Sequence, residues 1–130
     1  MSYDYVLDSY AWKEYFDGTK KGQRVAELLT RFRIATPVLV LAELSDVFER
    51  SHLNFEVPLR FIQSKSSIIP LHQEIAIKAG VFKVQKRKII SDFGLADAII
   101  YMTAQYTGAR LVTGDLHFSK SDDVHFLENK

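Results

Sequence analysis

Short apolar runs alternate along this chain with longer segments that repeat apolar residues at helical spacing. In residues 22–31 and 72–85 the apolar positions recur every three or four residues, which is the period of an amphipathic helix. Runs of two to five apolar residues between polar or turn residues are typical of short buried strands. The pattern predicts strands at residues 3–7, 34–35, 67–70, 109–113 and 124–127, and helices at residues 10–16, 22–31, 37–50, 58–64, 72–85 and 94–107.

Turn and capping residues sharpen several of these boundaries. Asp17-Gly18 should end the first helix and Gly108 the last one. Thr36 is expected to cap the third helix, with Pro37 as its first residue, because threonine is a good N-cap and proline suits the first turn. Residues 83–92 form the most polar stretch and are expected to be a loop.

Strands that alternate with helices, without hairpin signals between them, favour a parallel sheet. We therefore expect an α/β fold with about five short parallel strands and helices on both faces, built as one domain over residues 1–130. In open sheets of this kind, functional sites form beyond the carboxyl ends of the strands.

Composition excludes several classes of protein. The sequence has no cysteine, which removes thiolate metal sites and cysteine nucleophiles, and its net charge of +1 is far from that of a simple nucleic-acid coating protein. No apolar run approaches the roughly 18 residues that a membrane span requires. The first residues lack a signal-peptide pattern, so a cytoplasmic location is expected.

Four carboxylates lie where a carboxylate is costly, within apolar stretches at a strand end or in a helix. Burying an unpaired carboxylate costs several kcal/mol or more, and no lysine or arginine stands beside any of the four in its own segment. A divalent cation such as Mg²⁺ or Mn²⁺ would compensate them, since hard cations prefer carboxylate oxygen. The four residues are Asp8, Glu43, Asp97 and Asp115.

Each acidic residue also has a structural interpretation. Asp8 could cap the first helix, and Asp115 could be a turn residue. The helix dipole could stabilise Asp97 in the first turn of its helix. Glu43 differs, because its neighbours at helical spacing are apolar and a solvated glutamate is not expected there. One shared site explains all four better than four separate coincidences.

Four segments in this order resemble the acidic motifs of PIN domains, with the small VapC-type toxins as the nearest match. They are Tyr5-Val6-Leu7-Asp8-Ser9, residues 37–44 ending in Ala42-Glu43-Leu44, residues 94–100 containing Ala96-Asp97-Ala98, and residues 111–118 containing Thr113-Gly114-Asp115. The resemblance implies a Mg²⁺- or Mn²⁺-dependent endoribonuclease, usually a homodimer, with an antitoxin protein as partner and RNA as substrate. It carries over Asp8, Glu43, Asp97 and Asp115 as metal-binding and catalytic carboxylates, with Ser9 and Thr113 as hydroxyl support.

In that chemistry the ion activates a water that attacks the phosphorus and leaves a 5′-phosphate, and either Glu43 or Asp97 positions or deprotonates this water. The rival interpretations are an inactive PIN-like module that binds RNA or serves as a scaffold, and a phosphoacceptor receiver domain. The receiver domain needs a lysine at the end of the last core strand, and residues 111–115 have none.

Weaker signals remain outside the four motifs. Asp92 and His117 could assist the site, although roles as a cap and a packed loop residue are favoured. A basic run could follow RNA phosphates or simply be a solvated helix end, and an N-terminal aromatic series could supply both core and a partner surface. The basic run is Lys83, Lys86, Arg87 and Lys88; the aromatic series is Tyr3, Tyr5, Tyr10, Trp12, Tyr15 and Phe16.

Overall fold

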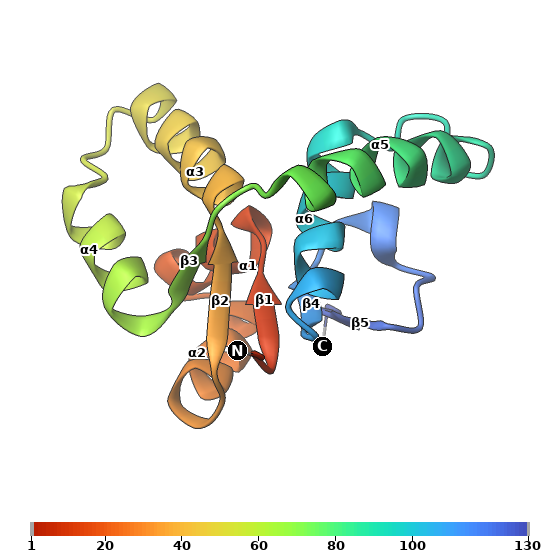
Figure 1. Cartoon of the computed structure of the whole chain (residues 1–130). Coiled ribbons are helices and arrows are strands. Elements are labelled where there is room, and N and C mark those ends of the chain that lie inside the picture. Colours follow the sequence, from red (N-terminus) through yellow and green to blue (C-terminus); the bar gives the residue numbers. More distant parts are fainter. Residues whose placement is uncertain (1, 130) are drawn as a thin grey trace.

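A five-stranded sheet, parallel throughout, forms the centre of the molecule (Figure 1). The computed structural model describes residues 2–129, so residues 1 and 130 of the expected domain lie outside the described part. The strand order is β3-β2-β1-β4-β5. These strands are β1 (Tyr5–Leu7), β2 (Ile34–Pro37), β3 (Ser67–Ile69), β4 (Arg110–Thr113) and β5 (Val124–Phe126).

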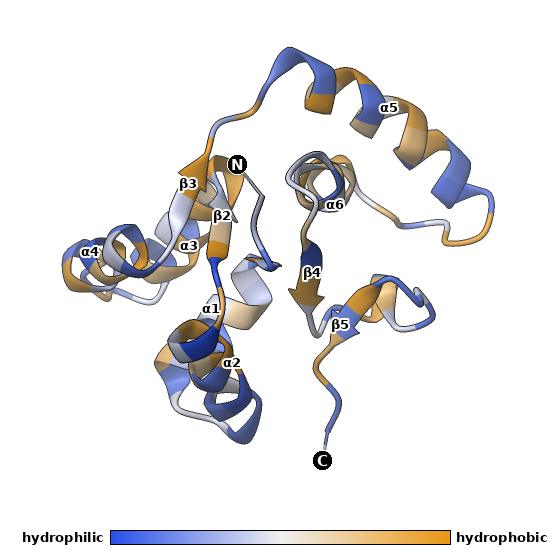
Figure 2. Cartoon of the chain, turned by 60° about the horizontal axis from the view of Figure 1, so that its bottom comes forward, coloured by the Kyte–Doolittle hydropathy of each residue, from blue (hydrophilic) through white to orange (hydrophobic). Residues whose placement is uncertain are grey.

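Among residues 2–129, six α-helices flank this sheet on both sides. Helices α5 and α6 pack together over one side, and α1 and α2 pack together on the other (Figure 2). The predicted α/β fold with about five parallel strands is therefore confirmed. The helices are α1 (Ser9–Asp17), α2 (Lys20–Arg31), α3 (Val38–Arg50), α4 (Glu56–Lys65), α5 (Gln73–Arg87) and α6 (Leu95–Tyr106), with a short 3-10 helix, η1, at Leu116–Phe118.

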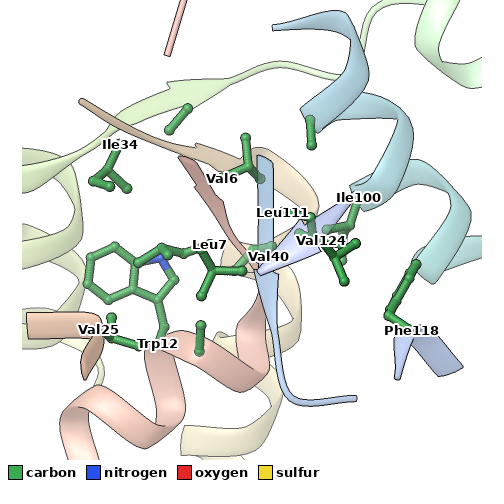
Figure 3. Close-up of a cluster of buried hydrophobic side chains, with 14 of the residues drawn as sticks. Val6, Leu7, Trp12, Val25, Ile34, Val40, Ile100, Leu111, Phe118 and Val124 are labelled. Atoms are coloured by element: carbon green, nitrogen blue, oxygen red, sulfur yellow. The ribbon is translucent and has the colours of Figure 1, made fainter. Parts of the chain in front are cut away.

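The core consists of the apolar strand residues and the helix faces that cover them. Val6 pairs with Ala35 on one side and Leu111 on the other, and all three side chains are buried. Val6 and Leu111 lie in the cluster of buried side chains in Figure 3. Trp12 of α1 is completely buried, and its indole nitrogen donates a hydrogen bond to Thr36 Oγ1 at 3.1 Å. The strands are short, yet their continuous apolar sequence is explained because helices cover both faces of the sheet.

The predicted start of the third helix is wrong. Thr36 and Pro37 belong to β2, where they pair with Ile68 and Ile69, and α3 begins only at Val38. Pro37 occupies the N-cap position without a side-chain bond. Thr36 is fully buried and hydrogen-bonds Trp12 and Ser66, so its hydroxyl is satisfied by the core rather than by a helix N-terminus.

The polar stretch at residues 83–92 is only partly a loop. Helix α5 continues through Arg87, so three of the four residues in the basic run, Lys83, Lys86 and Arg87, lie on its last turns. Long side chains such as lysine and arginine have high helix propensity, which polarity alone does not indicate. Helix α2 also begins earlier than predicted, because Thr19 accepts a capping bond from Gly22 N–H. Within the described residues, none of the helices is long and apolar enough to cross a bilayer.

Candidate metal centre

Two of the four singled-out carboxylates follow adjacent strands. Asp8 comes directly after β1, and Asp115 lies two residues beyond the end of β4. Because β1 and β4 pair in parallel, both side chains emerge at the carboxyl edge of the sheet. Glu43 and Asp97 come from α3 and α6, two helices that contact each other. The four motifs thus meet at the edge where sites form in sheets of this type.

Asp8 is buried, with 7% of its surface exposed. Its Oδ1 accepts the N–H of Ala11 at 2.8 Å and so caps α1, and the Thr113 hydroxyl donates to the same carboxyl group. Burial raises the pKa of Asp8 to about 7, and these two hydrogen bonds offset part of the increase. Asp115 and Glu43 raise that pKa further through their negative charge.

Glu43 carries a buried oxygen with no hydrogen-bond partner. Its Oε1 is the one buried side-chain nitrogen or oxygen in the described part of the chain for which no partner exists. Burial raises the pKa of Glu43, a hydrogen bond from Ser9 counteracts this, and the charges of Asp97 and Asp115 raise it again. An unsatisfied buried carboxylate oxygen is expensive, and a hard cation is a ligand that would satisfy it.

Asp97, Asp115 and His117 converge on one point. His117 Nδ1 lies 2.9 Å from Asp97 Oδ2 and 3.4 Å from Asp115 Oδ1. One possible ligand atom from each of the three residues lies within 4.8 Å of those of the other two. The spacing and the mixed oxygen and nitrogen donors suit a divalent first-row metal ion.

Asp92 completes this arrangement from the loop that precedes α6. Its Oδ1 lies 3.2 Å from His117 Nε2, while its own side chain remains 79% exposed. The hydrogen bond to Asp92 is the main reason that the pKa of His117 is raised. A carboxylate on the outer nitrogen of a histidine is the usual way in which proteins orient a metal-binding imidazole.

Carboxylates of this cluster also hold backbone N–H groups. Asp115 Oδ1 accepts the N–H of His117 and caps η1, and Asp97 Oδ2 accepts the N–H of Gly94 at the start of α6. These bonds orient the carboxylates and leave further acceptor sites on their oxygens, since a carboxylate accepts about four hydrogen bonds. Within residues 2–129, none of the four acidic groups forms an ion pair with lysine or arginine.

Two residues with weaker sequence signals also lie at this edge of the sheet. The sequence favours His117 and Asp92 as loop and cap residues, and the structure places His117 among the carboxylates and Asp92 against its ring. The Thr-Gly-Asp-Leu-His spacing was the available signal, because a 3-10 turn after Asp115 returns residue 117 to the side chain of residue 115. Ser9 and Thr113, expected as hydroxyl support, do hydrogen-bond Glu43 and Asp8.

The fold is shared with solved toxin–antitoxin proteins. A toxin–antitoxin complex from Klebsiella pneumoniae is 22% identical, with a TM-score of 0.76 and coverage of 98% of this chain and 100% of that one. VapC20 from Mycobacterium tuberculosis, described as a sarcin–ricin loop cleaving toxin, is 14% identical with a TM-score of 0.74, and 96% of this chain and 100% of that chain align. VapBC2 from Rickettsia felis, bound to a DNA fragment from its promoter, is 20% identical with a TM-score of 0.71. The alignment covers 96% of this chain and 97% of that one.

A comparison with curated protein sequences found no significant match. The family model for the PIN domain, by contrast, matches residues 5–124, which include the whole sheet except the last two residues of β5, and all four acidic positions. With the fold, the acidic edge of the sheet and this match in agreement, the chain belongs to the PIN domain family.

Proposed function

We propose that this protein is a Mg²⁺- or Mn²⁺-dependent endoribonuclease and the toxin of a toxin–antitoxin pair. Membership of the PIN family and the toxin–antitoxin proteins with the same fold support the class of activity. The observation that carries the proposal is the orphaned Oε1 of Glu43 beside the cluster of Asp97, Asp115 and His117. In this proposal residues 1–130 form one nuclease domain that acts in the cytoplasm on RNA.

The proposed ion would be held by Asp97 and Asp115, with Asp8 and Glu43 facing it and His117 as a nitrogen donor. When bound, it would supply a polarised water and would neutralise charge on the scissile phosphate. The chain's own contribution is to orient the carboxylates through the capping bonds at the carboxyl edge of the sheet.

Glu43 is better placed than Asp97 to take the proton from the attacking water. Asp97 Oδ2 already accepts from Gly94 and contacts His117, whereas Glu43 Oε1 has no partner. The attack would break the bond from phosphorus to the 3′ oxygen and leave a 5′-phosphate on the product.

Cleavage of RNA by the purified protein tests this proposal. We expect cleavage with Mn²⁺ or Mg²⁺, none with EDTA, and 5′-phosphate ends detected by mass spectrometry. Asp97→Asn and Asp115→Asn should each slow cleavage at least about 100-fold, which corresponds to a loss of roughly 2.7 kcal/mol. Asp46→Asn is the matched control, because Asp46 is an exposed carboxylate of α3 paired with Arg50.

Two outcomes would contradict the proposal. Full cleavage in EDTA would exclude a metal mechanism. Tight RNA binding without cleavage under any divalent ion would instead support the rival interpretation, an inactive RNA-binding or scaffold module.

A protein antitoxin and a second copy of the chain complete the proposed set of partners. The complexes of similar fold from Klebsiella pneumoniae and Rickettsia felis support an antitoxin. The aromatic residues Tyr15 and Phe16 are only partly buried where they pack on Phe61 of α4, so we propose this cluster as the surface that binds the antitoxin.

A further inference from the structure

A groove of about 750 Å³ opens beside the metal centre. Asp115 and His117 of the centre line it together with Tyr10, Lys21 and Gly114. Among the described residues that line this groove, Lys21 is the only lysine or arginine, whereas two are aspartates. An RNA strand carries one phosphate charge per nucleotide, so a strand that enters this groove requires a cation there.

Lys21 is held in place by an aromatic neighbour rather than by an acid. Its Nζ donates a hydrogen bond to the Tyr10 hydroxyl at 2.7 Å and lies 5.1 Å from the centre of the ring. No carboxylate in the described part of the chain forms an ion pair with it. An ammonium group has three donor hydrogens, so the bond to Tyr10 leaves it able to bind an anion.

Tyr10 in turn is fixed against the residue that precedes Asp115. A β-carbon at Gly114 would lie 2.1 Å from Cε1 of the Tyr10 ring, which means that the ring occupies the space a side chain would need. The contacts from Lys21 to Tyr10, and from Tyr10 to Gly114, therefore tie the ammonium group to the backbone beside Asp115. This places a fixed positive charge next to the carboxylates.

We propose that Lys21, positioned by Tyr10, binds an RNA phosphate adjacent to the scissile phosphate. The inference rests on the proposed ribonuclease activity and deepens it by naming a substrate-binding residue. A phosphate is favoured over a base because the ring of Tyr10 already packs on Gly114 and the ammonium is a point charge. Such a contact positions the strand and does not read its sequence.

The test compares Lys21→Gln with the matched variant Lys20→Gln. Lys20 is the preceding residue of α2, is exposed, and does not line the groove. With a fluorescent single-stranded RNA and Mn²⁺, Lys21→Gln should raise KM about fivefold to tenfold with little change in kcat, while Lys20→Gln should match the wild type. Lys21→Arg should have a KM close to that of the wild type, and Tyr10→Phe should raise KM less than Lys21→Gln does.

Salt dependence provides a readout that a structural role would not move. In cleavage-deficient Asp97→Asn protein, the slope of log Kd against log salt for single-stranded RNA should decrease by about 0.7 when Lys21 becomes Gln. An unchanged slope and KM in Lys21→Gln, a fall in kcat alone, or equal losses in both lysine variants would overturn the inference. If the wild type neither binds nor cleaves RNA, the proposed function fails instead, so the two failures are distinguishable.

Discussion

At the scale of single residues, an acidic side chain can be both a helix cap and a member of the carboxylate cluster, two interpretations that the sequence presents as alternatives. Asp8 is both the N-cap of α1 and a member of the carboxylate cluster. The capping bond orients the group, while burial and neighbouring charge make its ionised form costly. The proposed cation would reconcile these effects, because it would favour the ionised form of every group in the cluster.

Asp8 should therefore weaken the metal-free fold as pH rises. Its pKa is about 7 when folded against an ordinary value of 3.8, so the folded state binds more protons than the unfolded chain between these values. The resulting loss of stability begins above pH 4 and is complete above pH 7, reaching at most about 4 kcal/mol. In EDTA, urea unfolding should show that the free energy of unfolding falls more between pH 5 and pH 8 for the wild type than for Asp8→Asn, which keeps the capping oxygen.

The control for this measurement is Asp17→Asn, which removes an exposed carboxylate paired with Lys13. The free energy of unfolding of Asp17→Asn should fall with pH by the same amount as that of the wild type. If Asp8→Asn declines just as steeply, Asp8 is not ionising in an unfavourable environment.

His117 should make the centre selective for Mn²⁺ over Mg²⁺. Imidazole nitrogen suits first-row transition metals, whereas Mg²⁺ prefers oxygen. In calorimetric titrations, His117→Ala should weaken Mn²⁺ binding about tenfold or more and change Mg²⁺ binding much less. His72→Ala is a suitable control, because His72 is exposed and packs on Tyr106 of α6. Equal Mn²⁺ affinity in His117→Ala and the wild type would show that the ring is not a ligand.

At the scale of elements, the crossing of α1 and α2 depends on one glycine. Gly22 lies in the first turn of α2, where a β-carbon would be 2.0 Å from the backbone oxygen of Glu14 in α1. The two helices pack closely only because this position has no side chain. The crossing also carries Tyr10 and Lys21, so its geometry sets the groove beside the metal centre.

Gly22→Ala should therefore destabilise the protein by about 1–3 kcal/mol or more, since backbone rather than a flexible side chain must move. Gly80→Ala in α5 is the matched control, because a β-carbon there meets no atom within 4 Å. Alanine should stabilise that half-buried helix position by up to about 1 kcal/mol. Urea unfolding curves measure both changes, and equal effects of the two substitutions would contradict the packing argument.

At the scale of the whole molecule, α5 presents an apolar stripe to solvent, made up of Ile77, Val81 and Val84. These residues are 63%, 57% and 64% exposed, and their spacing of four and three places them on one helix face. Single exposed apolar residues are ordinary, but three on one face of a helix form a patch. Homodimer interfaces are enriched in such residues, so we assign this stripe to the proposed dimer.

Val81→Asp should separate the dimer into monomers. Light scattering coupled to size-exclusion chromatography at micromolar concentration should give about twice the chain mass of 14.9 kDa for the wild type and the single-chain mass for the variant. Val57→Asp provides the control, since Val57 is 67% exposed on α4, away from the stripe. A dimer that survives Val81→Asp would place the interface elsewhere, for example at the aromatic cluster of α1 and α4.

Much of the architecture is already determined by the sequence. All five strands and six helices occur where apolar runs and helical periodicity predict them, with boundaries that differ by a few residues. Local signals suffice here because a strand covered on both faces must be continuously apolar, and because Gly18 in left-handed conformation ends α1 whatever surrounds it. The four carboxylates are also found from sequence, since an acid within an apolar segment is conspicuous locally.

Only the tertiary structure decides which side chains face one another. Local capping preference assigned Thr36 to a helix, but pairing with β3 and the indole of Trp12 kept it in β2. His117 joins Asp97 across twenty residues, and Lys21 reaches the groove through Tyr10, because the strand order brings β1 beside β4. Such contacts depend on the packing of segments distant in sequence, and no pattern within one segment encodes them.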